Sequence, residues 1–176
     1  KCFISTGSPL SPETFKFMNK KLNSKSFIHS VSGGTDIVSC FMLGVPTLPV
    51  YAGEIQGPGL GMNIDIFNEK GNPTKSTGEL VCKTPFPSKP VYFWNDKNFS
   101  KYKSAYFNKF KNIWSHGDYV KKTVNGGYII YGRSDATLNP GGVRIGTGEI
   151  YNSLQKFNWI ADCLATGFIT DNDEKI

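Results

Sequence analysis

Long apolar runs are missing from this sequence of 176 residues. The longest apolar stretch, residues 37–53, is interrupted by a serine, a threonine and two prolines, which excludes a membrane-spanning helix. Residues 1–10 lack an apolar region followed by a cleavage site, so the sequence predicts no signal peptide.

Arginine is also scarce, because only Arg133 and Arg144 stand among the 20 Lys and Arg residues. No run of basic residues is longer than two, so the net charge of +6 is spread along the chain. This pattern argues against a nucleic-acid-binding stripe and predicts a solvated cationic surface. The two arginines lie in one glycine-rich segment, and an arginine guanidinium is well suited to bidentate recognition of phosphate. Surface ion pairs are the alternative for both.

The four cysteines, at positions 2, 40, 82 and 163, form no CxxC pair. Their spacing argues against a zinc site or a dithiol redox motif. Widely scattered cysteines favour a reduced, cytoplasmic protein over a disulfide scaffold.

Apolar residues (39%) and aromatic residues (14%) are sufficient for a folded core. The chain begins with a lysine that leads directly into a predicted strand, and its last residues form no terminating element. We therefore expect a piece of a longer protein, with one domain and part of another.

The order of predicted elements is mixed and indicates an α/β fold with a β-rich middle. Helical spacing follows Ser11 and Pro12 up to Lys21, and Asn125-Gly126 between two apolar runs predicts a hairpin. Turn-forming composition after Gly132 predicts a domain boundary near Asp135. The other predicted elements are strands at 2–5, 27–30, 62–67, 78–82 and 161–170, a loop at 32–36, a helix around 99–106 and a helix capped by Thr147.

Two short segments carry polar groups suited to a nucleotide. In the first, Gly33 and Gly34 allow close approach of a ligand, Thr35 offers a hydroxyl to a phosphate and Asp36 offers oxygen to Mg²⁺. A polar turn is the alternative. In the second, residues 114–118, an aspartate can accept both hydroxyls of a ribose or can bond its own turn. The histidine beside it is either a general base or, as we favour, a packed or solvent-bonded side chain.

Five segments, taken in order, resemble the core motifs of the adenylate-forming acyl-CoA synthetases. They are Gly7-Ser8-Pro9; Ser32-Gly33-Gly34-Thr35-Asp36; Gly78-Glu79-Leu80; Trp114 with Gly117-Asp118; and residues 132–150, which include Arg133, Asp135 and Arg144. Within that family, the second and fifth segments are most similar to the enzymes that act on acetoacetate.

The resemblance implies a two-step reaction, in which a carboxylate and ATP give an acyl-adenylate and coenzyme A then displaces AMP. It implies that residues 1–134 form the end of a large AMP-binding domain with a β-rich subdomain. Residues 135–176 would be the hinge and the start of a small, mobile α+β domain. The family's phosphate loop would precede Lys1 and its catalytic lysine would follow Ile176, so we expect this piece alone to be inactive.

The resemblance also implies a role for single residues. Gly7, Ser8 and Pro9 would pack on adenine, Asp118 would bind the ribose, and Arg133 would contact ribose and phosphate. Thr35 would bond the α-phosphate, Asp36 would lie near Mg²⁺, and Arg144 would lie near the phosphates. Gly33 and Gly34 would line the acyl pocket, and Asp135 would be the hinge.

Relatives that use acetate have a tryptophan at the position of Gly33, so the glycine would leave room for acetoacetate. On this argument Gly33→Trp should shift the preference toward acetate. Two alternatives remain open: another short-chain ligase, such as an acetyl- or propionyl-CoA synthetase relative, and a non-catalytic nucleotide-binding protein.

Overall fold

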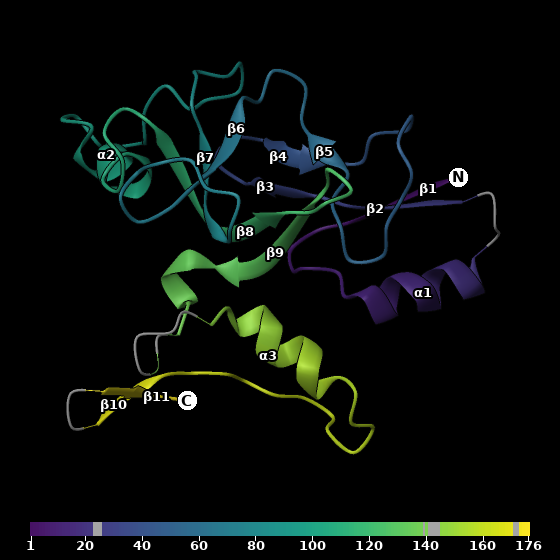
Figure 1. Cartoon of the computed structure of the whole chain (residues 1–176). Coiled ribbons are helices and arrows are strands. Elements are labelled where there is room, and N and C mark those ends of the chain that lie inside the picture. The colour runs from purple at the N-terminus through teal and green to yellow at the C-terminus, as the bar shows by residue number, and fades with distance from the viewer. Residues whose placement is uncertain (23–25, 139, 141–144, 171–172) are drawn as a thin grey trace.

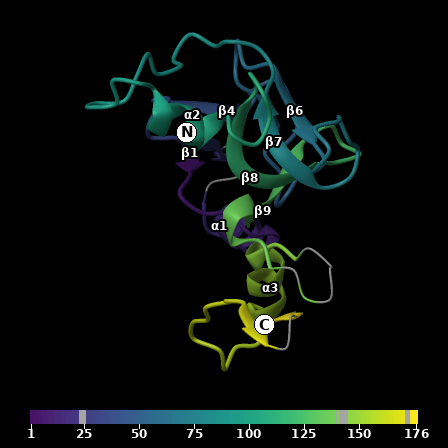
Figure 2. The ribbon, with the colours of Figure 1, turned by 90° about the vertical axis from the view of Figure 1, so that its left-hand side faces the viewer.

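The computed structural model describes residues 1–22, 26–138, 140, 145–170 and 173–176. Its element order is mixed α/β, as the sequence predicts. Most of the chain gathers into one body, and the C-terminal elements extend from it below β9 (Figure 1). Seen from the side, α3 and the C-terminus lie at the end away from β6 and β7 (Figure 2). Within the described part of the chain, none of the helices has the length and apolarity needed to span a bilayer.

The N-terminal unit is a parallel strand pair joined by a helix. β1 (Cys2–Ser5) pairs with β2 (Phe27–Ser30), with Cys2 opposite Phe27 and Ser5 opposite Ser30. α1 (Pro12–Lys21) connects them, and the Ser11 hydroxyl accepts a hydrogen bond from the Thr14 amide at 3.2 Å. The predicted N-cap and its following proline are confirmed.

Two antiparallel sheets follow. β3 (Ser32–Gly34), β4 (Ser39–Leu43) and β5 (Gly57–Pro58) form one, in that order. β6 (Ile64–Phe67), β7 (Gly78–Cys82), β8 (Trp114–Lys122) and β9 (Tyr128–Arg133) form the other. The hairpin predicted at Asn125-Gly126 joins β8 to β9.

The predicted loop at residues 32–36 is wrong for its first three residues. Ser32–Gly34 pairs with β4, and an added Cβ at Gly33 would lie 2.0 Å from the Ser39 carbonyl oxygen. Two glycines in a polar stretch predict a loop, but here they allow two strands to approach closely.

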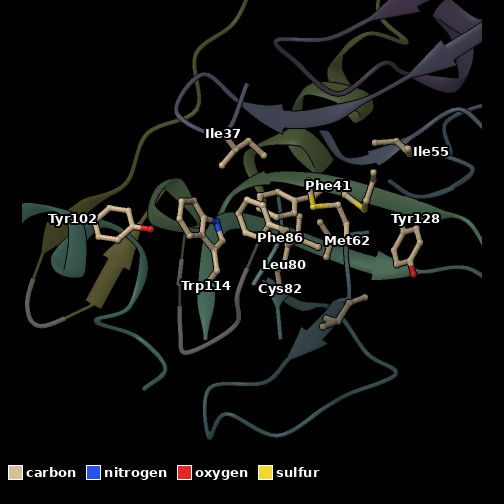
Figure 3. Close-up of a cluster of buried hydrophobic side chains, with 13 residues drawn as sticks. Ile37, Phe41, Ile55, Met62, Leu80, Cys82, Phe86, Tyr102, Trp114 and Tyr128 are labelled. Carbon is tan, nitrogen blue, oxygen red and sulfur yellow. The ribbon is translucent and has the colours of Figure 1, made fainter. Parts of the chain in front are cut away.

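The core lies between these sheets and contains residues from both. Phe41 and Met42 of β4 meet Leu80 of β7 and Trp114 of β8, and all four are almost fully buried. In Figure 3, Tyr102 and Trp114 lie at one end of the cluster, and Ile55 and Tyr128 lie at the other. Because the sheets share this core, the positions of β3 and β8 are fixed relative to each other.

α2 (Ser100–Tyr106) covers the Trp114 end of the core and confirms the helix predicted there. The ring of Tyr106 stacks on Trp114 with centroids 3.7 Å apart and planes 13° apart. An aromatic pair of this kind contributes about 0.5–1.5 kcal/mol beyond its buried area. The stack fixes the place of Tyr106 near the start of β8.

The C-terminal elements begin with the short helix η1 (Ser134–Ala136), followed by α3 (Thr147–Leu154). Thr147 is the first residue of α3 and not its cap. The cap is Gly146, where an added Cβ would lie 2.5 Å from the Tyr131 carbonyl oxygen, so only glycine fits.

The strand predicted at 161–170 is too long. Among the described residues of that stretch, only β10 (Phe168–Thr170) pairs, with β11 (Asp173–Lys175).

Candidate nucleotide-binding cleft

A cleft of about 200 Å³ opens where the N-terminal strand pair meets β3, β8 and β9. It brings together six of the residues that the resemblance singles out, from parts of the sequence up to 126 residues apart. These six are Gly7, Ser8, Pro9, Gly33, Asp118 and Arg133.

The parallel pairing of β1 and β2 explains part of this assembly. Parallel strands place their carboxyl ends at the same edge of a sheet, and ligands of α/β folds bind at that edge. Residues 6–9 follow β1 and residues 31–33 follow β2, and the Val31 amide donates to the Ser5 carbonyl at 3.0 Å. The two segments therefore line one wall of the cleft together.

Asp118 lies on the opposite side, in β8, and its carboxylate is held mainly through one oxygen. The Ser32 hydroxyl donates to Oδ2 at 2.8 Å. Oδ1 has a longer contact, 3.4 Å, with Nη1 of Arg133. The side chain of Asp118 is 12% exposed, at the cleft. Oδ1 is therefore oriented by its neighbours and keeps acceptor capacity for a ligand hydroxyl.

Arg133 lies across Gly117 and reaches back to β8. Its Nη1 donates to the His116 carbonyl oxygen at 3.0 Å. Gly117 has φ +85°, and an added Cβ would lie 2.2 Å from Nη2 of Arg133. A glycine is required here both by the backbone angle and by the guanidinium that covers it. About half of the Arg133 side chain is exposed, so its outer face is free to meet an anion.

His116 is packed rather than exposed to the cleft, as we favoured. Its Nε2 lies 3.0 Å from the Gly33 carbonyl oxygen, and its ring meets Phe41 edge-on at 4.6 Å. Burial lowers the pKa of His116, although the nearby Asp118 acts in the opposite direction. The ring is therefore neutral at pH 7, donates from Nε2 to β3 and does not line the cleft.

Thr35 and Asp36 do not line the cleft. Both are exposed in the turn after β3, and the Tyr106 hydroxyl donates to Asp36 Oδ2. Burial, followed by the bond to Asp36, raises the pKa of Tyr106 far above its ordinary value. Tyr106 therefore stays protonated and acts as the donor.

The described residues contain no group of three or more metal-ligating side chains. Magnesium bound with a nucleotide takes one or two protein carboxylates and its remaining ligands from phosphates and water, so a single exposed carboxylate such as Asp36 is compatible with the predicted role.

The structure contradicts the volume argument for Gly33. Its missing side chain would point at the backbone of β4, not into open space, because an added Cβ would lie 2.0 Å from Ser39 O and 2.8 Å from Cys40 Cα. Gly33→Trp would push two strands apart and is no test of acyl preference. Gly34 is less confined, since an added Cβ would meet Cε1 of His116 at 3.0 Å.

Asp135 lies in η1, between β9 and the C-terminal elements. Its Oδ1 is 3.4 Å from Nε of Arg133, and 73% of its side chain is exposed. The third predicted phosphate contact, Arg144, lies outside the described residues.

Two residues of the site had no role assigned from the sequence. Ser32 orients Asp118, and Glu79 binds the Gly117 amide at 2.7 Å. Both stand inside the quoted motifs, but only the pairing of distant strands places them beside Asp118.

Comparison with known proteins agrees with the motifs. No protein-family model matches the sequence. The chain is 54% identical over 177 residues to the acetoacetyl-coenzyme A synthetase of Rhizobium meliloti (strain 1021), covering 100% of this chain and 27% of that protein. It is 47% identical to the acetoacetyl-CoA synthetase of Gallus gallus, covering 98% of this chain and 26% of that protein.

Two solved structures share the fold. The acetoacetyl-CoA synthetase of Streptomyces lividans superposes with a TM-score of 0.85 at 42% identity, over 95% of this chain and 26% of that chain. An anthranilate CoA ligase in complex with anthranoyl-AMP superposes with a TM-score of 0.79 over 96% of this chain and 31% of that chain. Because its identity is 18%, the second likeness shows the fold alone.

The comparisons therefore agree with the family that the five motifs indicate, the adenylate-forming acyl-CoA synthetases. Within that family, it is similar over its whole length to acetoacetyl-CoA synthetases. It spans about a quarter of the length of these curated relatives.

Proposed function

We propose that this chain is the nucleotide-binding part of an enzyme that ligates acetoacetate to coenzyme A. The observation that carries the proposal is the cleft, in which Asp118, Arg133 and residues 7–9 meet. The similarity to acetoacetyl-CoA synthetases supports the substrate. The alternative, another short-chain acyl-CoA ligase, is distinguished by comparing acetoacetate with other short-chain acids as substrates.

In this proposal, the ribose hydroxyls donate to Oδ1 of Asp118 while Ser32 holds Oδ2. The adenine packs on the turn Gly7-Ser8-Pro9. Arg133 turns its exposed face to the ribose and the phosphate, where a guanidinium stabilises charge. These contacts hold the α-phosphate in place for attack.

Catalysis would proceed by acyl transfer through an adenylate. A carboxylate oxygen of acetoacetate attacks the α-phosphorus of ATP, and the bond to pyrophosphate breaks. The thiol sulfur of coenzyme A then attacks the acyl carbon and AMP leaves, which gives acetoacetyl-CoA. Thr35 would donate its hydroxyl to the α-phosphate, and Arg144 would add positive charge there. Asp36 would hold Mg²⁺, which would neutralise charge on the phosphates.

We also propose that Asp135 is the hinge between a large domain that ends near residue 134 and a small domain that follows. Rotation there would break the 3.4 Å contact between Arg133 and Asp135 and separate α3 from β9. Asp135→Pro should therefore impair one half-reaction more than the other, because it fixes one backbone angle at the hinge. Equal losses in both half-reactions would contradict the hinge role.

The scattered cysteines, all four of which carry free thiols, favour the cytosol as the compartment. There the product would feed ketone-body carbon into lipid synthesis.

The nucleotide-binding role is tested by Asp118→Ala in a full-length synthetase that carries this sequence. A hydrogen bond to a charged group contributes roughly 1.5–3 kcal/mol, so the affinity for ATP should fall by roughly 10- to 100-fold. Asp65→Ala is the matched control, because Asp65 lies in the same sheet and makes an ion pair with Lys83 at 2.8 Å. An equal affinity for ATP in both variants would refute the assignment of Asp118.

A further inference from the structure

β8 contains a bulge at the point where it presents Asp118. Glu79 of β7 pairs with Tyr119, and Val81 pairs with Ser115. One residue of β7 is therefore opposite three residues of β8, namely 116–118. A bulge leaves backbone groups without their usual strand partners, and an unpaired buried amide is costly.

The peptide group between His116 and Gly117 is held from both sides. Its N–H donates to Oε1 of Glu79 at 2.7 Å. Its carbonyl accepts from Nη1 of Arg133 at 3.0 Å. Two side chains therefore replace the strand partners that the bulge removes, and one of them is a predicted nucleotide ligand.

Glu79 is itself fixed in place. It is 3% exposed, and its second oxygen, Oε2, accepts from Nζ of Lys109 at 2.5 Å. A buried carboxylate requires such a partner, because its desolvation is otherwise uncompensated. The ion pair with Lys109 compensates the burial of Oε2, and Oε1 remains directed at the bulge.

From these contacts we infer that Glu79 is a positioning residue for nucleotide recognition, acting through the 116–117 peptide on Asp118 and Arg133. The inference rests on the proposed nucleotide-binding role of the cleft and assigns the sugar hydroxyls as the feature that Glu79 helps to select. Without the acceptor at Oε1 the peptide turns, and Asp118 and Arg133 lose their shared geometry.

The reach of the Glu79 side chain and its charge can be separated. Glu79→Gln keeps an acceptor at the same distance but removes the charge. Glu79→Asp keeps the charge but is one methylene shorter, so its oxygen withdraws from the Gly117 amide. If Glu79 acts by positioning, nucleotide recognition is retained in Glu79→Gln and lost in Glu79→Asp. A purely electrostatic or stabilising role predicts the reverse.

The control is Glu54, a second carboxylate that braces the same hairpin at its other end. Its Oε2 accepts from Thr123 at 2.8 Å, and its Oε1 accepts from Asn125 at 2.9 Å. Glu54→Ala should loosen the hairpin turn without touching the bulge.

The experiment measures the Kd of AMP, 2′-deoxy-AMP and 3′-deoxy-AMP by calorimetry in a full-length synthetase that carries this sequence. The unsubstituted enzyme should prefer AMP over each deoxy form by at least about tenfold. Glu79→Asp should reduce that ratio to within about threefold of unity, while Glu79→Gln and Glu54→Ala retain it.

Asp118→Asn separates the two levels of the proposal. If that variant keeps the full preference for AMP, the ribose assignment fails. If Asp118→Asn loses the preference and Glu79→Asp keeps it, the ribose assignment stands and the inference about Glu79 is overturned. Loss of the preference in Glu79→Gln but not in Glu79→Asp overturns it as well.

Discussion

Gly117→Ala tests whether the guanidinium of Arg133 must lie where the structure has it. Gly117 has φ +85°, and an added Cβ would lie 2.2 Å from Nη2 and 2.8 Å from Cζ of Arg133. Carbon and nitrogen atoms in ordinary contact are about 3.5–4.0 Å apart, so the guanidinium must move by more than about 1 Å. The Arg133 side chain is half exposed and has room to move outward.

Gly126→Ala is the matched control, because it imposes the same backbone cost without the clash. Gly126 has φ +88°, and nothing lies within 4 Å of an added Cβ. A left-handed conformation costs a non-glycine residue roughly 1–2 kcal/mol, and the stiffer unfolded chain returns about 0.4–1 kcal/mol. Both variants should therefore lose about 1 kcal/mol of unfolding free energy.

Only Gly117→Ala should weaken nucleotide binding. Loss of one charged hydrogen bond from Arg133 corresponds to roughly 1.5–3 kcal/mol, or roughly 10- to 100-fold in Kd for AMP. Calorimetric titration of a full-length synthetase gives the Kd, and urea denaturation gives the stability. Equal Kd values for the two variants would refute the role of Arg133. So would additive effects of Gly117→Ala and Arg133→Ala, because residues that act through one contact are not additive.

Three further outcomes follow from the cleft and its surroundings. Tyr106→Phe keeps the aromatic stack but removes the donor to Asp36. The adenylation rate should therefore fall several-fold and reach its maximum only at a higher Mg²⁺ concentration, while the melting temperature stays unchanged. A normal Mg²⁺ dependence would contradict the role of Asp36. Burial lowers the pKa of His116 below its ordinary 6.5, so below that pH the unfolded chain binds more protons than the folded chain, and stability should fall as the pH drops below 6.5. Urea denaturation of His116→Gln should show a smaller fall, and an equal fall would exclude this histidine as the cause. Gly33→Ala should lower the melting temperature strongly, because its Cβ would meet the Ser39 carbonyl oxygen at 2.0 Å, and a stable, active variant would restore the volume argument for acyl preference.

Local signals in the sequence predict the elements that have local causes. Ser11 and Pro12 define the start of α1, and Asn125-Gly126 defines the hairpin between β8 and β9. Six of the residues that the resemblance singles out also lie together in the cleft, because the resemblance supplies an order of motifs that no single segment carries alone.

The features that the sequence does not predict have non-local causes. Gly33 and Gly34 have turn-like composition, and only the neighbouring strand β4 makes them a strand. The bulge of β8 leaves no mark in the residue pattern, so the role of Glu79 depends on the register between β7 and β8. Gly146 caps α3 because the Tyr131 backbone lies against it, a contact that helix propensity does not encode.

The most direct test of the account is acid-dependent ATP–pyrophosphate exchange by a full-length synthetase that carries this sequence, with acetoacetate, acetate and butyrate compared at equal concentration. The account predicts the fastest exchange with acetoacetate and a loss of exchange in Asp118→Ala at limiting ATP. Faster exchange with another acid would contradict the proposed substrate. No exchange with any acid, despite ATP binding, would contradict the ligase function itself and leave a non-catalytic nucleotide-binding protein.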